Sequence, residues 1–232
     1  DLSIGARVDY ERKTAVLKTF FEPTIAPDRL VEPEASFATV SPHVSIAVRV
    51  QPGKMVYGTV GRGFKAGGFN AASPAGLEAY AEEHTRNVEG GVKTTWAGGR
   101  VTVNAAVFRI VWDDLQLNLP DPAVPGQFYI ANVGSAVSKG LEFELQARVR
   151  PGVDLFSAVG YTNARFGEGS RSSGVLVAGN DIPNTPEYTA TVGVQLSRAV
   201  RLNETVFARV EVTRYGAFTY DDLNTAGQSA YA

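Results

Sequence analysis

The sequence predicts an all-β fold: an antiparallel transmembrane β-barrel, of which this chain forms a partial barrel of about nine or ten strands. Three observations predict it. Apolar and polar residues alternate with a period of two along most of the chain. Most alternating segments reach about 10 residues, which is long enough to cross a bilayer at a tilt. The connections between the segments are alternately short and long, as in barrels with short periplasmic turns and long extracellular loops.

The alternating segments follow one another from the first residues onward. In the first, Leu2, Ile4 and Val8 share one face, and polar residues share the other. Clear alternation covers 2–10, 44–51, 88–96, 101–107, 141–149, 188–197 and 201–212, and weaker alternation covers 54–63 and 153–166. Glu204 interrupts the last pattern, because it lies on the apolar face of its segment next to a turn.

The connections are of two kinds, and the two kinds alternate. Glycine- or proline-containing stretches, and one of Arg, Ala and Val, predict tight turns at 51–54, 97–99, 150–152 and 198–200. Long polar stretches rich in glycine and proline lie near 18–36, 65–84, 118–128 and 167–185. A repeated order of strand, short turn, strand and long loop is typical of outer-membrane barrels.

The alternation also predicts which face meets which solvent. Lipid offers the backbone no hydrogen bonds, so a spanning sheet must pair its strands in a closed barrel, with apolar side chains outward and polar ones inward. Trp96 and Tyr10 lie at strand ends, where a girdle of aromatic residues is expected. Alternation alone also fits a soluble carbohydrate-binding β-sandwich, whose sheets are half buried in water. Strand length and loop asymmetry favour the barrel.

Composition excludes several classes of function. The 232 residues carry a formal net charge of −2, whereas a nucleic-acid binder needs a basic face. The chain has no cysteine, so it has no disulfide framework, thiolate nucleophile or cysteine-ligated zinc. No apolar run approaches the roughly 20 residues of a transmembrane helix. The residues from Asp1 to Ile4 do not begin a signal peptide, so we expect the chain to start inside a longer protein.

Several short motifs resemble those of TonB-dependent outer-membrane receptors. The first runs from Tyr57 to Asn70 and contains Gly63-Phe64-Lys65-Ala66-Gly67-Gly68-Phe69-Asn70. The others follow in the order that this family shows: 87–93, with the form N-x-E-x-G-x-K, then 104–108 with 112–116, 132–134 with 138–144, 160–164, and 183–186. Each motif is weak by itself, but their order and spacing cover most of residues 2–217.

The resemblance implies a fold, a location and a function. Residues 1–232 would be part of the receptor's 22-stranded barrel, without its plug domain and closing strands. The parent protein would lie in the outer membrane of a Gram-negative bacterium and actively import a scarce nutrient, most often a ferric siderophore. Its partners would be outer-membrane lipid, the small-molecule ligand and, through the missing plug, TonB; we expect no nucleic-acid partner. The alternative within membrane barrels is a passive porin-like channel.

Seven residues are candidates for contact with the ligand, all at an outer loop or on the inward face. Four belong to the glycine-rich stretch: Phe64, Lys65, Phe69 and Asn70. A nucleotide loop would need a helix after these glycines, but Pro74 and Ser73 break one. Glu142, Glu144 and Arg148 share the inward face of one strand, where we expect an ion-pair ladder that also includes Lys93, with ligand steering as a second role.

We expect no catalytic residues, no metal site and no cofactor. Asp113-Asp114 and Asp221-Asp222 are adjacent in strands or loops, so their carboxylates diverge, and solvated loop acids are the simpler interpretation. His43 and His84, expected at a strand start and in a loop, accompany no Ser or Asp in a nucleophile–base arrangement. The sequence therefore predicts a transport protein and not an enzyme.

Overall fold

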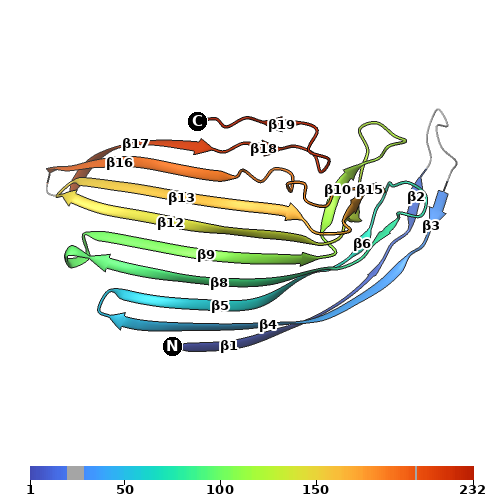
Figure 1. The fold of residues 1–232 in the computed structure, drawn as a ribbon, viewed down its shortest axis with the longest axis horizontal. Coiled ribbons are helices and arrows are strands. Elements are labelled where there is room, and N and C mark those ends of the chain that lie inside the picture. The colour runs from blue at the N-terminus through green and yellow to red at the C-terminus, as the bar shows by residue number, and fades with distance from the viewer. Residues whose placement is uncertain (20–28, 202) are drawn as a thin grey trace.

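Residues 1–19, 29–201 and 203–232 are described by a computed structural model, in which one large antiparallel sheet dominates (Figure 1). Within these residues the sheet has nine strands, and each strand pairs with the next one in the order β1-β4-β5-β8-β9-β12-β13-β16-β17. The strands are β1 (Leu2–Thr14), β4 (Glu34–Gln51), β5 (Lys54–Lys65), β8 (Glu83–Trp96), β9 (Val101–Asp113), β12 (Ala136–Arg150), β13 (Val153–Phe166), β16 (Tyr188–Arg201) and β17 (Glu204–Tyr215). The predicted strands are confirmed, and most run beyond the apolar residues that reveal them.

The long connections lie at one end of the sheet and carry small hairpins of their own (Figure 1). The hairpins pair β2 (Leu17–Thr19) with β3 (Arg29–Val31), β6 (Gly68–Phe69) with β7 (Ala79–Tyr80), β10 (Gln116–Pro120) with β11 (Phe128–Asn132), β14 (Arg171–Ser172) with β15 (Val175–Leu176), and β18 (Phe218–Thr219) with β19 (Gly227–Gln228). The short turns lie at the opposite end, and one contains the 3₁₀ turn η1 (Ala97–Gly99). In the described residues no helix has the length and apolarity needed to cross a bilayer.

One predicted turn is wrong. Residues 198–200 lie inside β16, which continues to Arg201 and pairs there with Glu204. The side chains of Arg201 and Glu204 are 3.5 Å apart as an ion pair. The alternation of apolar residues fades before the hairpin ends, because the last ladder positions lie past the apolar band and tolerate charged side chains.

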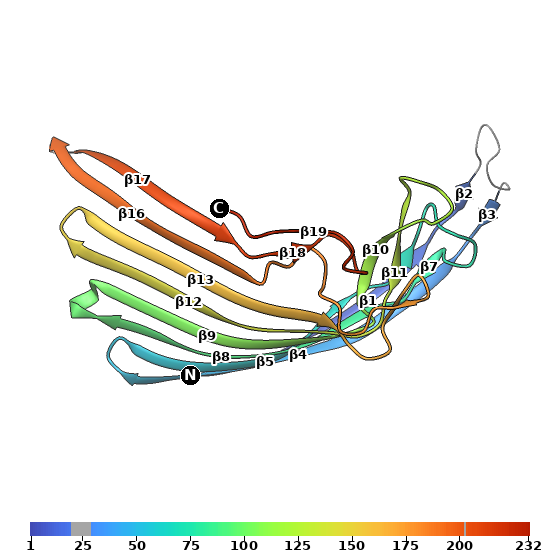
Figure 2. The same ribbon diagram turned by 45° about the horizontal axis from the view of Figure 1, so that its top comes forward.

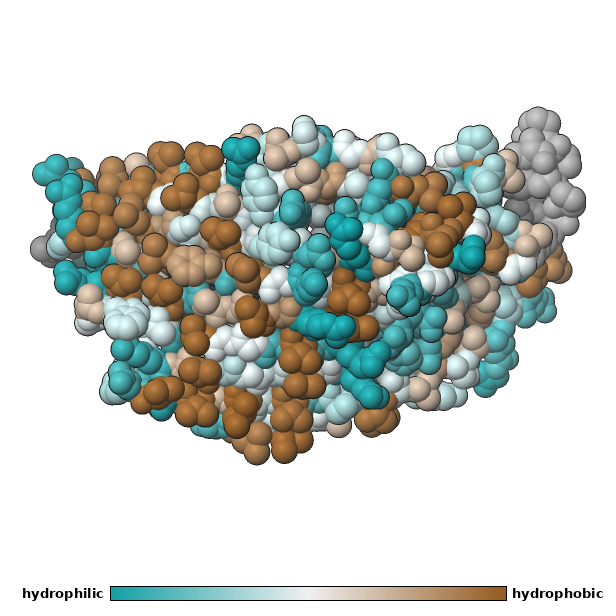
Figure 3. All heavy atoms as spheres, in the orientation of Figure 1, coloured by the Kyte–Doolittle hydropathy of each residue, from teal (hydrophilic) through white to brown (hydrophobic). Residues whose placement is uncertain are grey.

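The outward face of the sheet is apolar and is not covered by any other part of the chain that the structure describes. Cross-strand pairing sets Ile46 beside Leu2 and Gly58, and sets Val192 beside Ser157 and Val212. Ile46 is 53% exposed and Val192 is 61% exposed. Figure 3 shows hydrophobic side chains gathered over the strands and hydrophilic ones more frequent toward the long loops. A water-soluble sandwich would bury this face, so the exposure supports the membrane interpretation.

The sheet is open and curved, with β1 and β17 as its outer strands (Figure 2). Inward-facing aromatic rings lie flat against this wall, each over a glycine directly opposite on the next strand. The pairs are Tyr57 over Gly91, Phe108 over Gly140 and Phe156 over Gly193. Covering a glycine with a cross-strand ring stabilises sheets and keeps large rings close to the backbone. We call the space on the inward side of the curved sheet the trough. Rings held close to the backbone leave this space open.

The dry core of the described chain lies among the long loops, not under the sheet. Seven buried residues form it: Leu115, Leu119, Tyr129, Val133, Ala136, Phe166 and Val177. They come from the connection between β9 and β12, the connection between β13 and β16, and the strand ends beside them. This core gives the loop end a fixed shape, which a surface that recognises a ligand requires.

Candidate functional site

The middle of the inward face carries a cluster of acidic residues around one lysine. The Tyr57 hydroxyl donates a 2.7 Å hydrogen bond to Glu89 Oε1, and the Lys93 ammonium lies 5.4 Å from the centre of the Tyr57 ring. Glu142 and Glu144 lie beside them around a shallow hollow of about 160 Å³. The cluster therefore has three carboxylates and one ammonium, and it favours cationic groups.

The ion pairs of the predicted ladder are wrong, although Lys93 does line one hollow with Glu142 and Glu144. Arg148 Nε donates to Asp154 Oδ1 at 2.9 Å, and Glu144 accepts a hydrogen bond from Asn104 Nδ2 at 3.2 Å. No recorded ion pair among the described residues joins Glu142 or Glu144 to Arg148 or Lys93. Arg148 lies four positions along β12 from Glu144, a distance of about 14 Å. Asp154, by contrast, lies directly opposite Arg148 on β13.

Arg148 instead belongs to a second hollow, of about 450 Å³, near the short turns. It is lined by residues of β9, β12, β13, β16 and β17, among them Asp154, Phe156 and Arg209. The Arg209 guanidinium lies 4.0 Å from the centre of the Phe156 ring and 2.7 Å from Glu211 Oε2. Arg148 and the two predicted glutamates thus lie at different depths of the same inward face.

A third hollow, of about 680 Å³, opens where the inward face meets the long loops. Phe64, Lys65, Tyr80 and Gln116 line it together with charged residues of β1. Lys65 is exposed, and among the described residues no ion pair is recorded for it. Two of the predicted ligand-contact residues, Phe64 and Lys65, therefore meet in one hollow.

Gln116 is the residue of this hollow that sequence reasoning missed. Its side chain is buried and its Nε2 donates to the carbonyl oxygens of Ala66 at 3.1 Å and Ala81 at 2.9 Å. Its Oε1 is buried without a hydrogen-bond partner among the described residues. A buried acceptor without a partner costs about 1–3 kcal/mol, so Gln116 stores an unmet hydrogen-bonding capacity beside the hollow that its residue lines. The motif at 112–116, which ends at Gln116, is the only sequence feature that points to this residue.

A lysine of β1 fixes the edge of the same hollow. Lys13 Nζ donates to the carbonyl oxygen of Gly67 at 2.8 Å, lies 3.3 Å from Glu11 Oε2, and stands 5.7 Å from the centre of the Phe37 ring. Packing requires a glycine at position 67, because there is no room for a side chain. A Cβ on Gly67 would collide with the Tyr80 carbonyl oxygen and the Phe37 ring.

Asn70 is used by the loop itself. It is 7% exposed; its Nδ2 donates to the carbonyl oxygens of Leu77 and Ile130 at 2.9 Å, and its Oδ1 accepts from Ile130 N at 2.8 Å. These bonds join the loop after β5 to β11. Phe69 lies beside it in β6 and is half-buried. Ligand contact by Phe69 and Asn70 stays a prediction, and the geometry gives Asn70 a role in shaping the loop.

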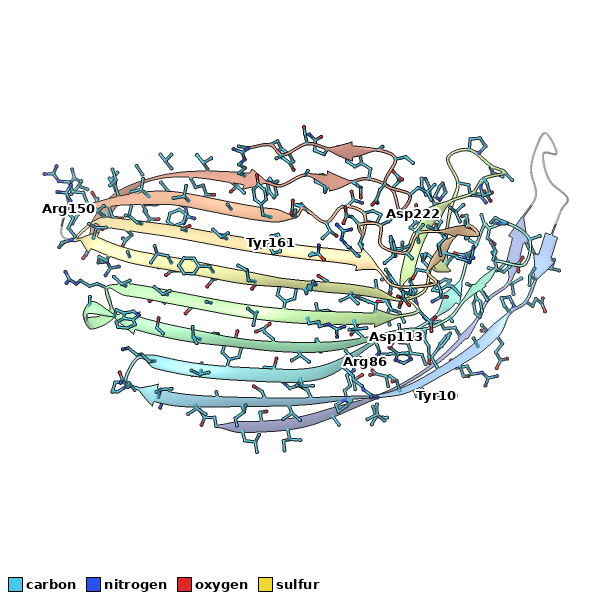
Figure 4. The ribbon with its side chains drawn as sticks, in the orientation of Figure 1. Tyr10, Arg86, Asp113, Arg150, Tyr161 and Asp222 are labelled. Carbon is cyan, nitrogen blue, oxygen red and sulfur yellow. The ribbon has the colours of Figure 1, made fainter. Side chains whose placement is uncertain are left out.

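Asp113 and Asp221 each bind structural partners, and the two histidines lie within strands. Asp113 ends β9 and binds Arg86 at 2.9 Å (Figure 4), whereas Asp221 accepts hydrogen bonds from Thr225 N at 3.0 Å and Ala226 N at 2.8 Å. These backbone bonds hold the pKa of Asp221 below its ordinary value. Both histidines lie within strands, β4 and β8, and not at the predicted strand start and loop. No group of three or more metal-ligating side chains occurs in the described part of the chain.

Comparison with known proteins agrees with the fold and with the motifs. The family model "TonB dependent receptor-like, beta-barrel" matches residues 1–232. The pesticin receptor of Yersinia enterocolitica is 30% identical over 179 residues, which are 76% of this chain and 25% of that protein. The crystal structure of the ferric yersiniabactin uptake receptor FyuA from Yersinia pestis superposes with a TM-score of 0.83 at 24% identity, covering 99% of this chain and 34% of that one.

A more distant structure shows the same fold. The siderophore receptor PiuA from Acinetobacter baumannii superposes with a TM-score of 0.70 at 17% identity, over 99% of this chain and 33% of that chain. This chain spans about a quarter of the curated relatives it matches and about a third of the solved structures. The matched family is a class of transport receptors and not a class of enzymes. The chain therefore belongs to the TonB-dependent receptor β-barrel family of the Gram-negative outer membrane.

Proposed function

We propose that this chain forms part of the barrel wall and outer loops of a receptor that imports a scarce nutrient, and that the nutrient is a ferric siderophore. The relatives support the substrate class, since they include a ferric yersiniabactin uptake receptor and a siderophore receptor. Coupling to TonB would pass through a plug inside the closed barrel. Residues 1–232 supply barrel wall and loops only.

The observation that carries the proposal is the hollow at the loop end of the inward face. It combines the exposed ammonium of Lys65 and the buried Oε1 of Gln116, neither with a partner among the described residues, with the rings of Phe64 and Tyr80. Aromatic surface with a few well-placed polar groups is the usual composition of a small-molecule site. Siderophore complexes commonly carry carboxylate, catecholate or hydroxamate oxygens, and an ammonium matches these. The ordered loop core beside the hollow holds its shape.

The test is ligand binding and iron uptake by cells that make the polypeptide carrying this chain. Lys65→Gln removes one charged contact, which is worth about 1.5–3 kcal/mol, so we expect binding of the ferric siderophore to weaken about 10- to 100-fold. Arg150→Gln is the matched control, because Arg150 is a cation at the opposite end of the sheet (Figure 4). Equal binding of the ferric siderophore by both variants would show that Lys65 does not contact it.

A second measurement separates the receptor from a passive channel. Uptake of radioactive iron is followed before and after the inner-membrane proton gradient is collapsed with an ionophore. We expect uptake to stop while binding to the cell surface persists. Uptake that continues without the gradient would identify a porin-like barrel and contradict the proposed function.

A further inference from the structure

The large sheet divides into two branches at its loop end. Pairing between β4 and β5 stops at His43 and Gly61, whereas β1 stays paired with β4 as far as Glu34, and β5 stays paired with β8 as far as Lys65. Figures 1 and 2 show β1 and β4 continuing past this point toward β2 and β3. Within the described residues, the part of β4 nearest the long loops therefore has one edge without a strand partner.

A proline explains where the division begins. Ala47 exchanges backbone hydrogen bonds with Asp1 on the β1 side, so the even-numbered residues of this stretch of β4 direct their backbone groups toward β5. Pro42 is the first even-numbered position beyond the last β4–β5 pair, and proline has no N–H to donate. The ladder between β4 and β5 loses its next hydrogen bond there, and the two strands separate.

The separation leaves a crevice of about 420 Å³. Its walls are Thr39, Val40 and Ser41 of β4 on one side and residues of β5 and β8 with Asp113 on the other, including Arg62 and Arg86. Val40, Arg62 and Arg86 belong to the outward face by their place in the alternation, and the crevice shares Ser41, Arg62 and Gly63 with the hollow at the loop end. The crevice lies one step beyond the last apolar row that crosses all three strands, which is Val44, Val60 and Val88. On β5 and β8 it is therefore at the border of the lipid-facing band, which continues on β4 as far as Val40.

The side chains at this border carry an excess of positive charge. Arg62 lies directly opposite Arg86, and Arg109 lies directly opposite Lys139 and diagonal to Arg86. Arg86 forms an ion pair with Asp113, and His84 Nε2 lies 3.0 Å from Glu82 Oε1. Among the described residues, no ion pair is recorded for Arg62, Arg109 or Lys139, all of which are exposed. Four cations thus face two carboxylates.

Like charges directly opposite one another destabilise a sheet unless an anion lies between them. We infer that the crevice binds the phosphate of an anionic lipid of the outer leaflet, whose acyl chains lie on the apolar row below. Arginine suits phosphate because its planar guanidinium donates two parallel hydrogen bonds. The adjoining apolar row favours a lipid over a soluble anion, because only a lipid fills both surfaces. This inference rests on the membrane location of the sheet and not on the identity of the imported nutrient.

The test measures lipid binding by the detergent-solubilised polypeptide that carries this chain. The probes are micelles doped with a phosphorylated glycolipid of the outer leaflet, micelles doped with phosphatidylcholine, and free inorganic phosphate. The double variant Arg62→Gln/Arg109→Gln removes the two arginines without recorded partners. The control is Arg198→Gln, because Arg198 is an exposed arginine on the same outward face at the short-turn end.

We expect the double variant to bind the glycolipid about 25-fold more weakly, since each cation near an anionic surface contributes about fivefold. The control should bind as the unmodified protein does, and the Arg62→Lys/Arg109→Lys variant should keep most of the affinity. Added salt should weaken binding by the unmodified protein. Equal affinity in the double variant and the control, or equal binding of phosphatidylcholine and glycolipid, would overturn the inference. Free phosphate binding as tightly as the glycolipid would also overturn it, because the site would then serve a soluble anion.

Discussion

Placing a charge on the outward face should destabilise the protein far more than placing it on the inward face one residue away. Ile46 and Ser45 are consecutive in β4; the first is on the outward face and 53% exposed, and the second faces inward and is half-buried. Ile46→Arg puts a guanidinium against acyl chains. Ser45→Arg puts the same side chain into the watery trough, where substitutions usually change stability by less than about 0.5 kcal/mol.

The position of Ile46 sets the magnitude. The outward apolar residues of β4 run from Val40 to Val50, so Ile46 is four residues from the nearer end. Four residues span about 14 Å along a strand, or about 10 Å of depth at a 45° tilt. In an apolar band about 25 Å tall this is close to the midplane, where an arginine costs about 2–4 kcal/mol. The folding equilibrium should therefore shift about 30- to 800-fold for Ile46→Arg.

The assay is reversible unfolding by denaturant in phospholipid vesicles, with tryptophan fluorescence as the signal. The chain has two tryptophans, Trp96 and Trp112, and neither is altered by these variants. We expect the midpoint to fall strongly for Ile46→Arg and to stay almost constant for Ser45→Arg. If both variants shifted the midpoint equally, or if Ser45→Arg were the more damaging, the assignment of the two faces would be refuted.

Three further perturbations test the packing and the loops. Gly193→Ala should destabilise the barrel by about 1–3 kcal/mol in the same unfolding assay, because its Cβ would collide with the Phe156 ring; Gly160→Ala, with open space at its Cβ position, should be nearly neutral. Phe166→Ala removes a 3% exposed ring from the loop core and should loosen the loops by about 3–5 kcal/mol, seen as faster amide hydrogen exchange there, whereas Phe128→Ala, 55% exposed, should not. The pKa of Asp221 is lowered in the folded state, so its stabilising bonds to Thr225 and Ala226 are present above the ordinary pKa of 3.8 and are lost as pH falls through the lowered value. Acid should therefore lower the protection of these two amides relative to the exchange rate of a free peptide at the same pH. Asp221→Asn should remove that pH dependence while Asp222→Asn keeps it.

The sheet could be predicted from the sequence because lipid imposes a strict rule on each strand. Apolar residues must occupy every second position across the bilayer, and the segments from 141–149 and 188–197 obey it clearly. Strand ends obey no such rule, since they lie in water. For this reason the sequence predicts a β16–β17 hairpin that is shorter than the one in the structure. The loops were located by length and composition, but the core around Leu119 and Val177 depends on contacts between loops far apart in sequence.

The candidate site was only partly predictable. Phe64 and Lys65 were found through a motif, and the structure places them in one hollow. The inward position of Glu142 and Glu144 follows from alternation, but the partner of Arg148 depends on the register between β12 and β13, which one strand's pattern does not reveal. The role of Gln116 could not be predicted, because no alternation of apolar and polar residues marks a buried glutamine in a loop. The crevice beside Pro42 could not be predicted either, because it depends on whether each backbone group of β4 faces β1 or β5.

The most direct test of the central claim is a nitroxide scan along β16. The chain has no cysteine, so a single introduced thiol labels one position at a time within it. In vesicles, labels at Val192 and Val194 should collide mainly with oxygen dissolved in the lipid, and labels at Thr191 and Gln195 mainly with a water-soluble nickel chelate. Accessibility that fails to alternate along the strand, or a nickel chelate that reaches Val192 as readily as Thr191, would contradict a barrel wall between lipid and water.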